Sequence, residues 1–166
     1  MPDAGQEIIR VAHHRLVSEL PAVIRECLGK LSQEQVWWRA NPESNAVGNL
    51  VIHLCGATRH FLGRGVGGTD YVRDRDREFA EQGPIATPAL LTLLEGTVAE
   101  SDRVLTGLSP ARLFETTRNV EPAMTVLACL MRMSHHWAYH GGQIVTITKT
   151  LHGGGLNDLY RRAMVK

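Results

Sequence analysis

The stretch PAMTVLACLMRMSHHWAYHGGQIVTITKTL, residues 122–151, predicts a long helix and with it the class of fold. Its apolar and histidine positions recur at three-, four- and seven-residue steps, which is the period of one helix face. The positions on this face are Cys129, Met133, His136, His140 and Ile147. The β-branched run IVTIT at 144–148 continues the same face, so we interpret it as helix. The HGGG that begins at residue 152 ends this helix.

Three further segments show the same period and complete a bundle. Long helical patterns cover residues 6–27, 46–64 and a stretch from 87 to the GLSP at 107–110, and a short one covers 31–38. Strand signals are weak. Four long helices in one chain of this size predict an all-α fold, a four-helix bundle. A short extra helix follows the first long one, and a long connection joins the second to the third.

Several residues mark where these helices start or bend. Pro21 interrupts the first pattern, so we expect a kink there. Ser32 and Gln35 have the spacing of a capping box at the start of the short helix. Thr87 followed by Pro88 predicts the N-cap of the third long helix. The inward residues of that helix are expected to be Leu90, Leu91, Leu94, Val98 and Leu105.

The connection at residues 70–86 is highly charged. It contains DYVRDRDREFAEQGP, has few apolar positions and is stopped by Pro84. We interpret it as a solvated linker that is at most partly helical. It is either a lid over a site or an idle loop.

Composition describes one ordinary globular domain, residues 1–166. A chain of 166 residues with 43% hydrophobic and 21% charged residues can bury a sizeable core. A net charge of +1 gives no support for nucleic-acid binding. No apolar run reaches the ~18 residues of a membrane helix, and the N-terminus lacks a signal-peptide pattern. Three widely spaced cysteines argue against a disulfide framework and for a reducing cytoplasm.

Histidines carry the strongest functional signal. His136 and His140 are four residues apart, so their rings lie on one helix face and can converge on one metal ion. His53, on the second long helix, would add a third neutral nitrogen ligand from a facing helix. Three protein ligands and an open position are typical of catalytic rather than structural sites. The alternative is that these histidines are simply buried and hydrogen-bonded to their neighbours.

Other residues near this cluster are candidates for supporting roles. Small residues, Gly56 and Ala57, leave space beside the His53 ring. Asn49 and Gln143 are candidates to hydrogen-bond the ligands or to line a pocket. His60 lies two helical turns from His53, about 10 Å along the axis, which favours an outer-sphere or surface role.

The two histidine-bearing blocks resemble a known family. LSQEQVWWRANPESNAVGNLVIHLCGATRHFLG at 31–63, followed by HHWAYHGGQI at 135–144, is similar to the DinB-like (DinB/YfiT-like) superfamily. The resemblance implies a four-helix bundle with a three-histidine metal site, here His53, His136 and His140. One departure is Gly141, where many relatives carry a larger residue after the last histidine.

The resemblance implies a site whose reaction is open. Some relatives transfer low-molecular-weight thiols to electrophiles, and others look like metal-dependent hydrolases. A divalent ion held by three imidazoles can lower the pKa of bound water to ~7 or deprotonate a bound thiol. Zinc and nickel are the metals expected first, although imidazoles also suit copper and iron.

Our first hypothesis is therefore a metal-dependent enzyme, a low-molecular-weight-thiol S-transferase that acts on a small molecule. The alternative within enzymes is a metal-dependent hydrolase. The alternative from another class is a non-catalytic metal-binding or dimerisation module, in which His60 or Cys129 would close the coordination sphere. The bundle has helix faces through which it could form a homodimer, and no nucleic acid or membrane partner is expected.

Overall fold

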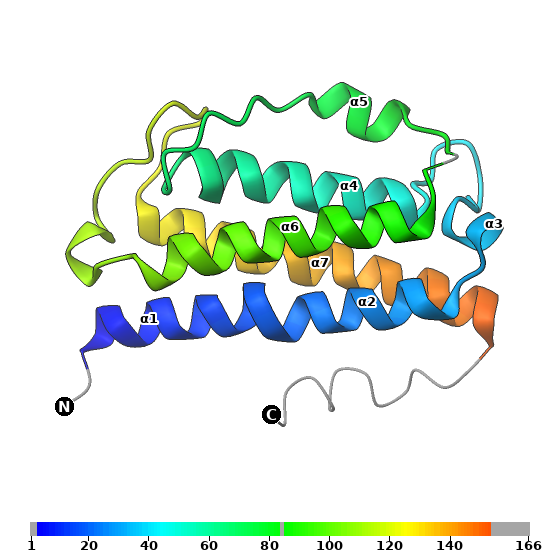
Figure 1. Ribbon diagram of the computed structural model, residues 1–166, viewed down its shortest axis with the longest axis horizontal. Helices are drawn as coiled ribbons and strands as arrows, with labels where there is room; N and C mark the ends of the chain where they lie inside the picture. Colours follow the sequence, from blue (N-terminus) through cyan, green and yellow to red (C-terminus); the bar gives the residue numbers. More distant parts are fainter. Residues whose placement is uncertain (1–2, 84, 154–166) are drawn as a thin grey trace.

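A computed structural model describes residues 3–83 and 85–153 and confirms the four-helix bundle (Figure 1). The first long helix is continuous through α1 (Ala4–His13), η1 (His14–Glu19) and α2 (Leu20–Lys30). The second comprises α4 (Val47–Thr58) and η2 (Arg59–Arg64), the third is α6 (Thr87–Thr106), and the fourth is α7 (Val126–His152). A single turn of 3₁₀-helix, η3 (Pro110–Arg112), lies between α6 and α7. The described residues contain no strand, only an isolated bridge between Thr116 and Thr125.

The predicted interruption at Pro21 takes the form of a wider helical turn just before it. Residues 14–19 are π-helical, and the N–H of Leu20 donates to the carbonyl of Arg15, five residues back. Pro21 has no N–H to donate, and its ring would crowd the carbonyl four residues earlier in a regular helix. The π turn absorbs this conflict, so the helix runs on to Lys30, three residues past the predicted end.

One predicted helix cap is confirmed, and two predicted helix starts need correction. The capping box is confirmed: Ser32 Oγ accepts from the Gln35 N–H and Gln35 Oε1 accepts from the Ser32 N–H, at the start of α3 (Gln33–Val36). Thr87, however, is the first helical residue rather than the cap. Its N–H and hydroxyl both donate to Gln33 Oε1, at 2.8 and 3.0 Å, so a distant side chain caps α6. The fourth long helix begins at Val126, with Thr125 as its cap, rather than near Pro122.

The core lies between the long helices and is lined mainly by leucines. Contacts join α2 to α7 and α4 to α6. Leu90, Leu94 and Leu105 are fully buried as predicted, whereas Leu91 is only half-buried and packs on the edge of the core. Trp137, the largest fully buried side chain, donates its indole N–H to Thr58 Oγ1 at 2.7 Å and thereby joins α7 to α4. No helix in the described ranges is long and apolar enough to cross a membrane.

The charged connection is not simply solvated, which corrects the prediction. It contains a short helix, α5 (Arg75–Ala80), capped by Asp74, that lies over α4 on the side away from α1 and α2 (Figure 1). Glu78 on this helix is 4% exposed. The side chain of Arg73, just before the helix, is 11% exposed. The two charges face inward because they pair with each other and with His53, a tertiary contact that the local charge pattern does not reveal.

Two glycines in the bundle helices predict opposite responses to an added methyl group. At Gly142 no neighbouring atom lies within 4 Å of a Cβ position, whereas at Gly56 a Cβ would overlap Glu78 Oε1. Because alanine is favoured over glycine inside helices, Gly142→Ala should raise the free energy of unfolding by about 0.5–1 kcal/mol. Gly56→Ala should lower it despite the same propensity gain. Urea denaturation of both variants checks this, and stabilisation by Gly56→Ala would contradict the burial of Glu78 above that glycine.

Candidate metal centre

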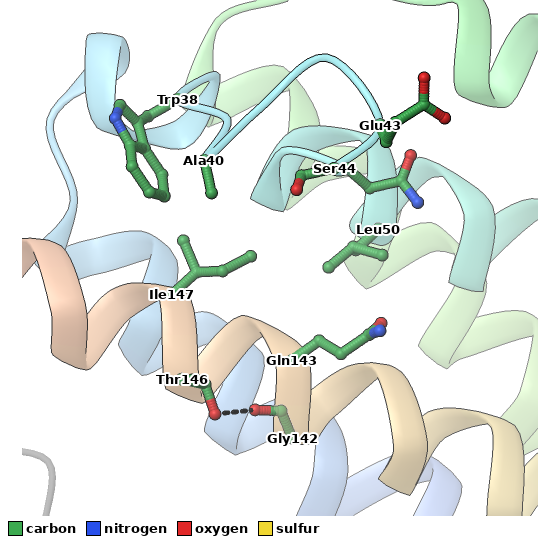
Figure 2. A pocket seen from close by; sticks show the side chains of 10 residues that line it. Trp38, Ala40, Glu43, Ser44, Leu50, Gly142, Gln143, Thr146 and Ile147 are labelled. Carbon is green, nitrogen blue, oxygen red and sulfur yellow. Dashed lines mark hydrogen bonds between the residues drawn. The ribbon is translucent and has the colours of Figure 1, made fainter.

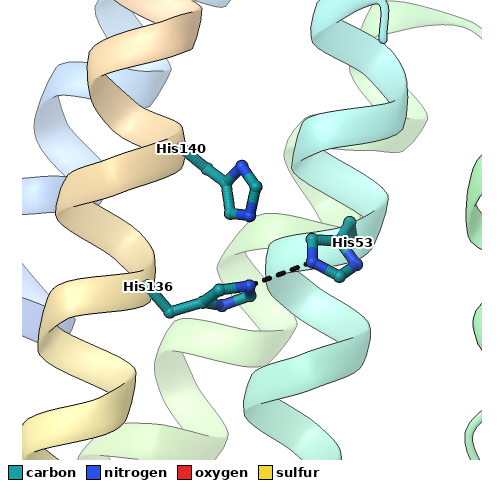
Figure 3. A group of neighbouring side chains, drawn as sticks. All are labelled: His53, His136 and His140. Carbon is teal, nitrogen blue, oxygen red and sulfur yellow. Dashed lines mark hydrogen bonds between the residues drawn. The ribbon is translucent and has the colours of Figure 1, made fainter. Parts of the chain in front are cut away.

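The structure brings together the three histidines that the sequence singled out. His53 projects from α4 and His136 and His140 project from α7, with their rings turned toward one another (Figure 3). One ring nitrogen from each lies within 4.8 Å of the others. His53 Nε2 and His136 Nε2 are 2.9 Å apart, and the ring centroids are separated by 4.6–5.0 Å. His53 is buried and the other two are half-buried, so the cluster reaches solvent from the α7 side.

Hydrogen bonds behind two of the rings orient them. His53 Nδ1 lies 2.9 Å from Glu78 Oε2, and His140 Nδ1 lies 2.7 Å from Gln143 Oε1. Each acceptor favours an N–H on Nδ1, which leaves the lone pair on Nε2, the ligand form of a neutral imidazole. Gln143 therefore has the supporting position predicted for it. His136 Nδ1 is buried and has no hydrogen-bond partner among the described residues.

Glu78 is the main residue of the site that sequence reasoning missed. Arg73 holds its carboxylate in a fork, Nε to Oε1 and Nη2 to Oε2, both at 2.7 Å. Burial opposes ionisation of Glu78, but the hydrogen bonds from Arg73 and His53 outweigh it and hold the pKa of this carboxyl below its usual value. Glu78 is therefore an anion at neutral pH, and it accepts from His53 as a carboxylate.

Gly56 explains how a carboxylate fits against α4. Glu78 Oε1 and Cδ occupy the space where a side chain at residue 56 would start. The sequence did show that Gly56 leaves room beside His53, but it could not show which residue fills that room. Glu78 sits within a run of alternating charges, where nothing local separates it from its solvated neighbours.

Asn49 holds the α5 segment in place rather than a histidine. Its Nδ2 donates to the backbone carbonyls of Glu78 and Glu81, at 3.1 and 2.7 Å. Its Oδ1 accepts from Arg39 Nη2 at 2.9 Å. The predicted supporting role is thus indirect: Asn49, which is fully buried, fixes the backbone that carries Glu78. Phe79 completes the cover, with its ring centroid 4.6 Å from that of His53.

His60 and Cys129 lie outside the cluster. The His60 ring packs edge-on against Phe61, with centroids 4.8 Å apart, and its Nδ1 is buried without a hydrogen-bond partner. Among the described residues no hydrogen bond or ring contact joins His60 to the three histidines, in keeping with its distance along the helix. Cys129 Sγ lies 3.5 Å from the carbonyl of Phe61, and burial raises the pKa of its thiol to about 12. Neither side chain completes the ligand set.

Electrostatics keep the ligands on α7 neutral. Burial, followed by repulsion from His140 and His53, lowers the pKa of His136 to about 3. Burial also lowers the pKa of His140, partly offset by its hydrogen bond to Gln143. Metal ligation requires unprotonated imidazole, so His136 and His140 already have the protonation state that a bound ion would require.

Pockets flank the cluster on two sides. A pocket of about 490 Å³ lies between α4, α7 and residues 38–45, and Gln143 and Gly142 line it (Figure 2). A shallow pocket of about 670 Å³ lies on the other side and is lined by His136 itself, with Arg132 and Tyr139. Both volumes are in the range of small-molecule sites.

Comparison with known proteins agrees with this picture. A DinB-like protein, YjoA from Bacillus subtilis, superposes with a TM-score of 0.64 at 16% identity, over 90% of this chain and 93% of that one. A conserved protein from Enterococcus faecalis gives a TM-score of 0.59 at 16% identity, over 90% and 96% of the two chains. No curated protein matches the sequence.

The chain has the fold of a DinB-like protein, which confirms the structural resemblance seen in the sequence. Residues 3–160 match the family described as "Protein of unknown function (DUF1572)", and the chain belongs to that family.

Replacing the missed carboxylate tests its link to the ligands. Glu78→Gln should weaken metal affinity 10- to 100-fold, because an acceptor behind a ligand histidine orients the ring and raises its basicity. Glu100→Gln is a matched control: Glu100 is also buried, pairs with Arg59 and lies over a glycine, Gly63. Competition titration against a chromogenic chelator measures both variants. Equal metal affinity in Glu78→Gln and the wild type would show that the contact is only structural.

The lowered pKa of His136 predicts a pH effect on the metal-free protein. The unfolded chain protonates this imidazole near pH 6.5, whereas the folded chain resists protonation down to about pH 3. The unfolded state therefore binds more protons in this window, and stability falls as the pH falls below about 6.5. Urea titrations at pH 7 and pH 5 should show that the free energy of unfolding falls less between the two pH values in His136→Gln than in the wild type. An equal loss would mean that His136 protonates freely in the fold.

Proposed function

We propose that this protein is a metal-dependent enzyme that transfers a low-molecular-weight thiol to a small electrophile. One divalent ion, zinc or nickel, would be held by His53, His136 and His140. The observation that carries the proposal is the convergence of three imidazole nitrogens from two helices within 4.8 Å. The DinB-like fold supports it, because the resemblance to that family implies a three-histidine metal site on this fold.

The residues present fit such an ion. Three neutral imidazoles suit zinc and nickel. Two of the three rings have acceptors behind them, Glu78 and Gln143, as ligand histidines in metal sites do. When bound, a divalent ion supplies Lewis acidity that lowers the pKa of a coordinated thiol or water.

The surrounding side chains favour a thiol over water as the nucleophile. Both oxygens of Glu78 are occupied by Arg73 and His53, so this carboxylate is not free to accept a proton from an attacking water. A thiol, with an ordinary pKa near 8.5, needs no such base once a cation stabilises its thiolate. A hydrolase, the second candidate, would rely on the metal-bound water alone, because the carboxylate bonded to the cluster is not free to assist it as a general base.

The non-catalytic alternative has less support. It requires a closed ligand sphere, and the two residues that could close it, His60 and Cys129, lie outside the cluster. We also propose a reducing, cytoplasmic location, which the three free and buried cysteines support. Homodimerisation and a single domain over 1–166 stay predictions.

Removing one ligand tests the proposal. His140→Ala should lower metal affinity by more than about 100-fold, beyond the effect of losing a supporting residue, and abolish thiol transfer. His152→Ala is the control, because His152 is an exposed histidine of α7 that lies outside the cluster and lines neither pocket. Elemental analysis of untagged protein gives metal per chain, and loss of free thiol with a test electrophile gives activity. Stoichiometric metal retained in His140→Ala would refute the ligand set. Turnover of an ester without any thiol would favour the hydrolase.

A further inference from the structure

The shallow pocket beside His136 differs in charge from the pocket on the other side of the cluster. Its lining includes two basic side chains, Arg132 and His135, together with Tyr139, Met124 and other apolar groups, and no carboxylate. The pocket beside Gln143 is lined by Glu43 and by no basic side chain. An anionic ligand that approaches the cluster therefore meets a matching charge only on the His136 side.

Arg132 lies in line with the metal ligands. It precedes His136 by four residues, and His140 follows after four more, so the three side chains form one stripe along α7. Side chains at this spacing are about 5–6 Å apart at Cβ. A small ligand with one end on the histidine cluster can thus place its other end near the guanidinium.

The guanidinium of Arg132 is stacked on an aromatic ring and has no polar partner among the described residues. It lies over the Phe61 ring, 4.7 Å from the centroid, and Phe61 is buried. No hydrogen bond or ion pair joins it to any group in residues 3–83 or 85–153. Arg73 and Arg59, by contrast, are both paired with buried glutamates. A stacked guanidinium keeps its planar set of N–H donors free, and that set matches the two oxygens of a carboxylate.

We propose that Arg132 forms a carboxylate subsite, so that the ligand reaching the histidine cluster is a thiol that also carries a carboxylate. This inference rests on the proposed thiol-binding function, and it adds the class of thiol. The carboxylate docks on the guanidinium while the sulfur occupies the cluster one helical turn away. A neutral thiol of the same shape would lack the contact between carboxylate and guanidinium.

Two probes that differ only in charge test the subsite. Cobalt(II)-loaded protein is titrated with 3-mercaptopropionate and with 3-mercaptopropionamide, and the sulfur-to-cobalt absorption band reports binding. The acid should bind at least tenfold more tightly than the amide, because only the acid forms a charge-assisted hydrogen bond with the guanidinium. In Arg132→Gln this preference should fall to about one, with the affinity for the amide unchanged. Lys149→Gln, which removes a positive charge elsewhere on α7, should keep the preference.

A second arm does not depend on metal or sulfur. In metal-free protein, propionate should produce a saturable shift of the Arg132 side-chain Nε–H resonance in a ¹H–¹⁵N spectrum, and propionamide should not. If neither thiol gives the absorption band but propionate shifts this resonance, the thiol function fails and the carboxylate subsite stands. If propionate produces no shift, or if the preference for the acid persists in Arg132→Gln, the subsite is overturned.

Discussion

The contact between the Glu78 carboxylate and His53 Nδ1 is the interaction on which the rest of the site depends. A carboxylate this deeply buried costs several kcal/mol unless its oxygens are all satisfied. Arg73 and His53 satisfy them, and Gly56 provides the space. Because these contacts join α4 to the α5 segment, the position of the connection and the orientation of the His53 ring depend on each other.

The bundle uses the same arrangement a second time without a histidine. Glu100 on α6 lies over Gly63 and pairs with Arg59, and its Oε1 has no hydrogen-bond partner in residues 3–83 and 85–153. There the carboxylate joins α6 to η2 and has no further consequence. At Glu78 the carboxylate also accepts a hydrogen bond from the imidazole of His53. That hydrogen bond determines which ring nitrogen of His53 faces the cluster.

The cluster consequently has one closed side and one open side. Glu78 and Phe79 of α5 cover His53, and Asn49 fixes the backbone beneath them. His136 and His140 are half-buried, and His136 lines a pocket that a small molecule can enter. This arrangement, covered behind His53 and open beside His136, is the one that the proposed enzyme needs, because a substrate must reach a catalytic metal.

The sequence by itself determined the bundle and singled out the three histidines that the fold brings together. Helix periodicity fixes which residues share a face, so the pairing of His136 with His140 and the inward position of His53 follow from spacing alone. Capping chemistry is also local where both partners are near in sequence, as at Ser32 and Gln35. The capping box and the His136–His140 pair could be predicted because their contacts span a few residues, whereas the place of His53 opposite them was what the family resemblance implied.

Only the tertiary structure decided the rest. Thr87 is capped by Gln33, and Glu78 is drawn inward by His53 and Arg73. In both cases a local pattern gave the wrong answer, a cap at Thr87 and a solvated charge at Glu78, because the deciding partner lies elsewhere in the chain. A charged side chain points into the core only where a buried group can pair with it, and only the fold brings that group near.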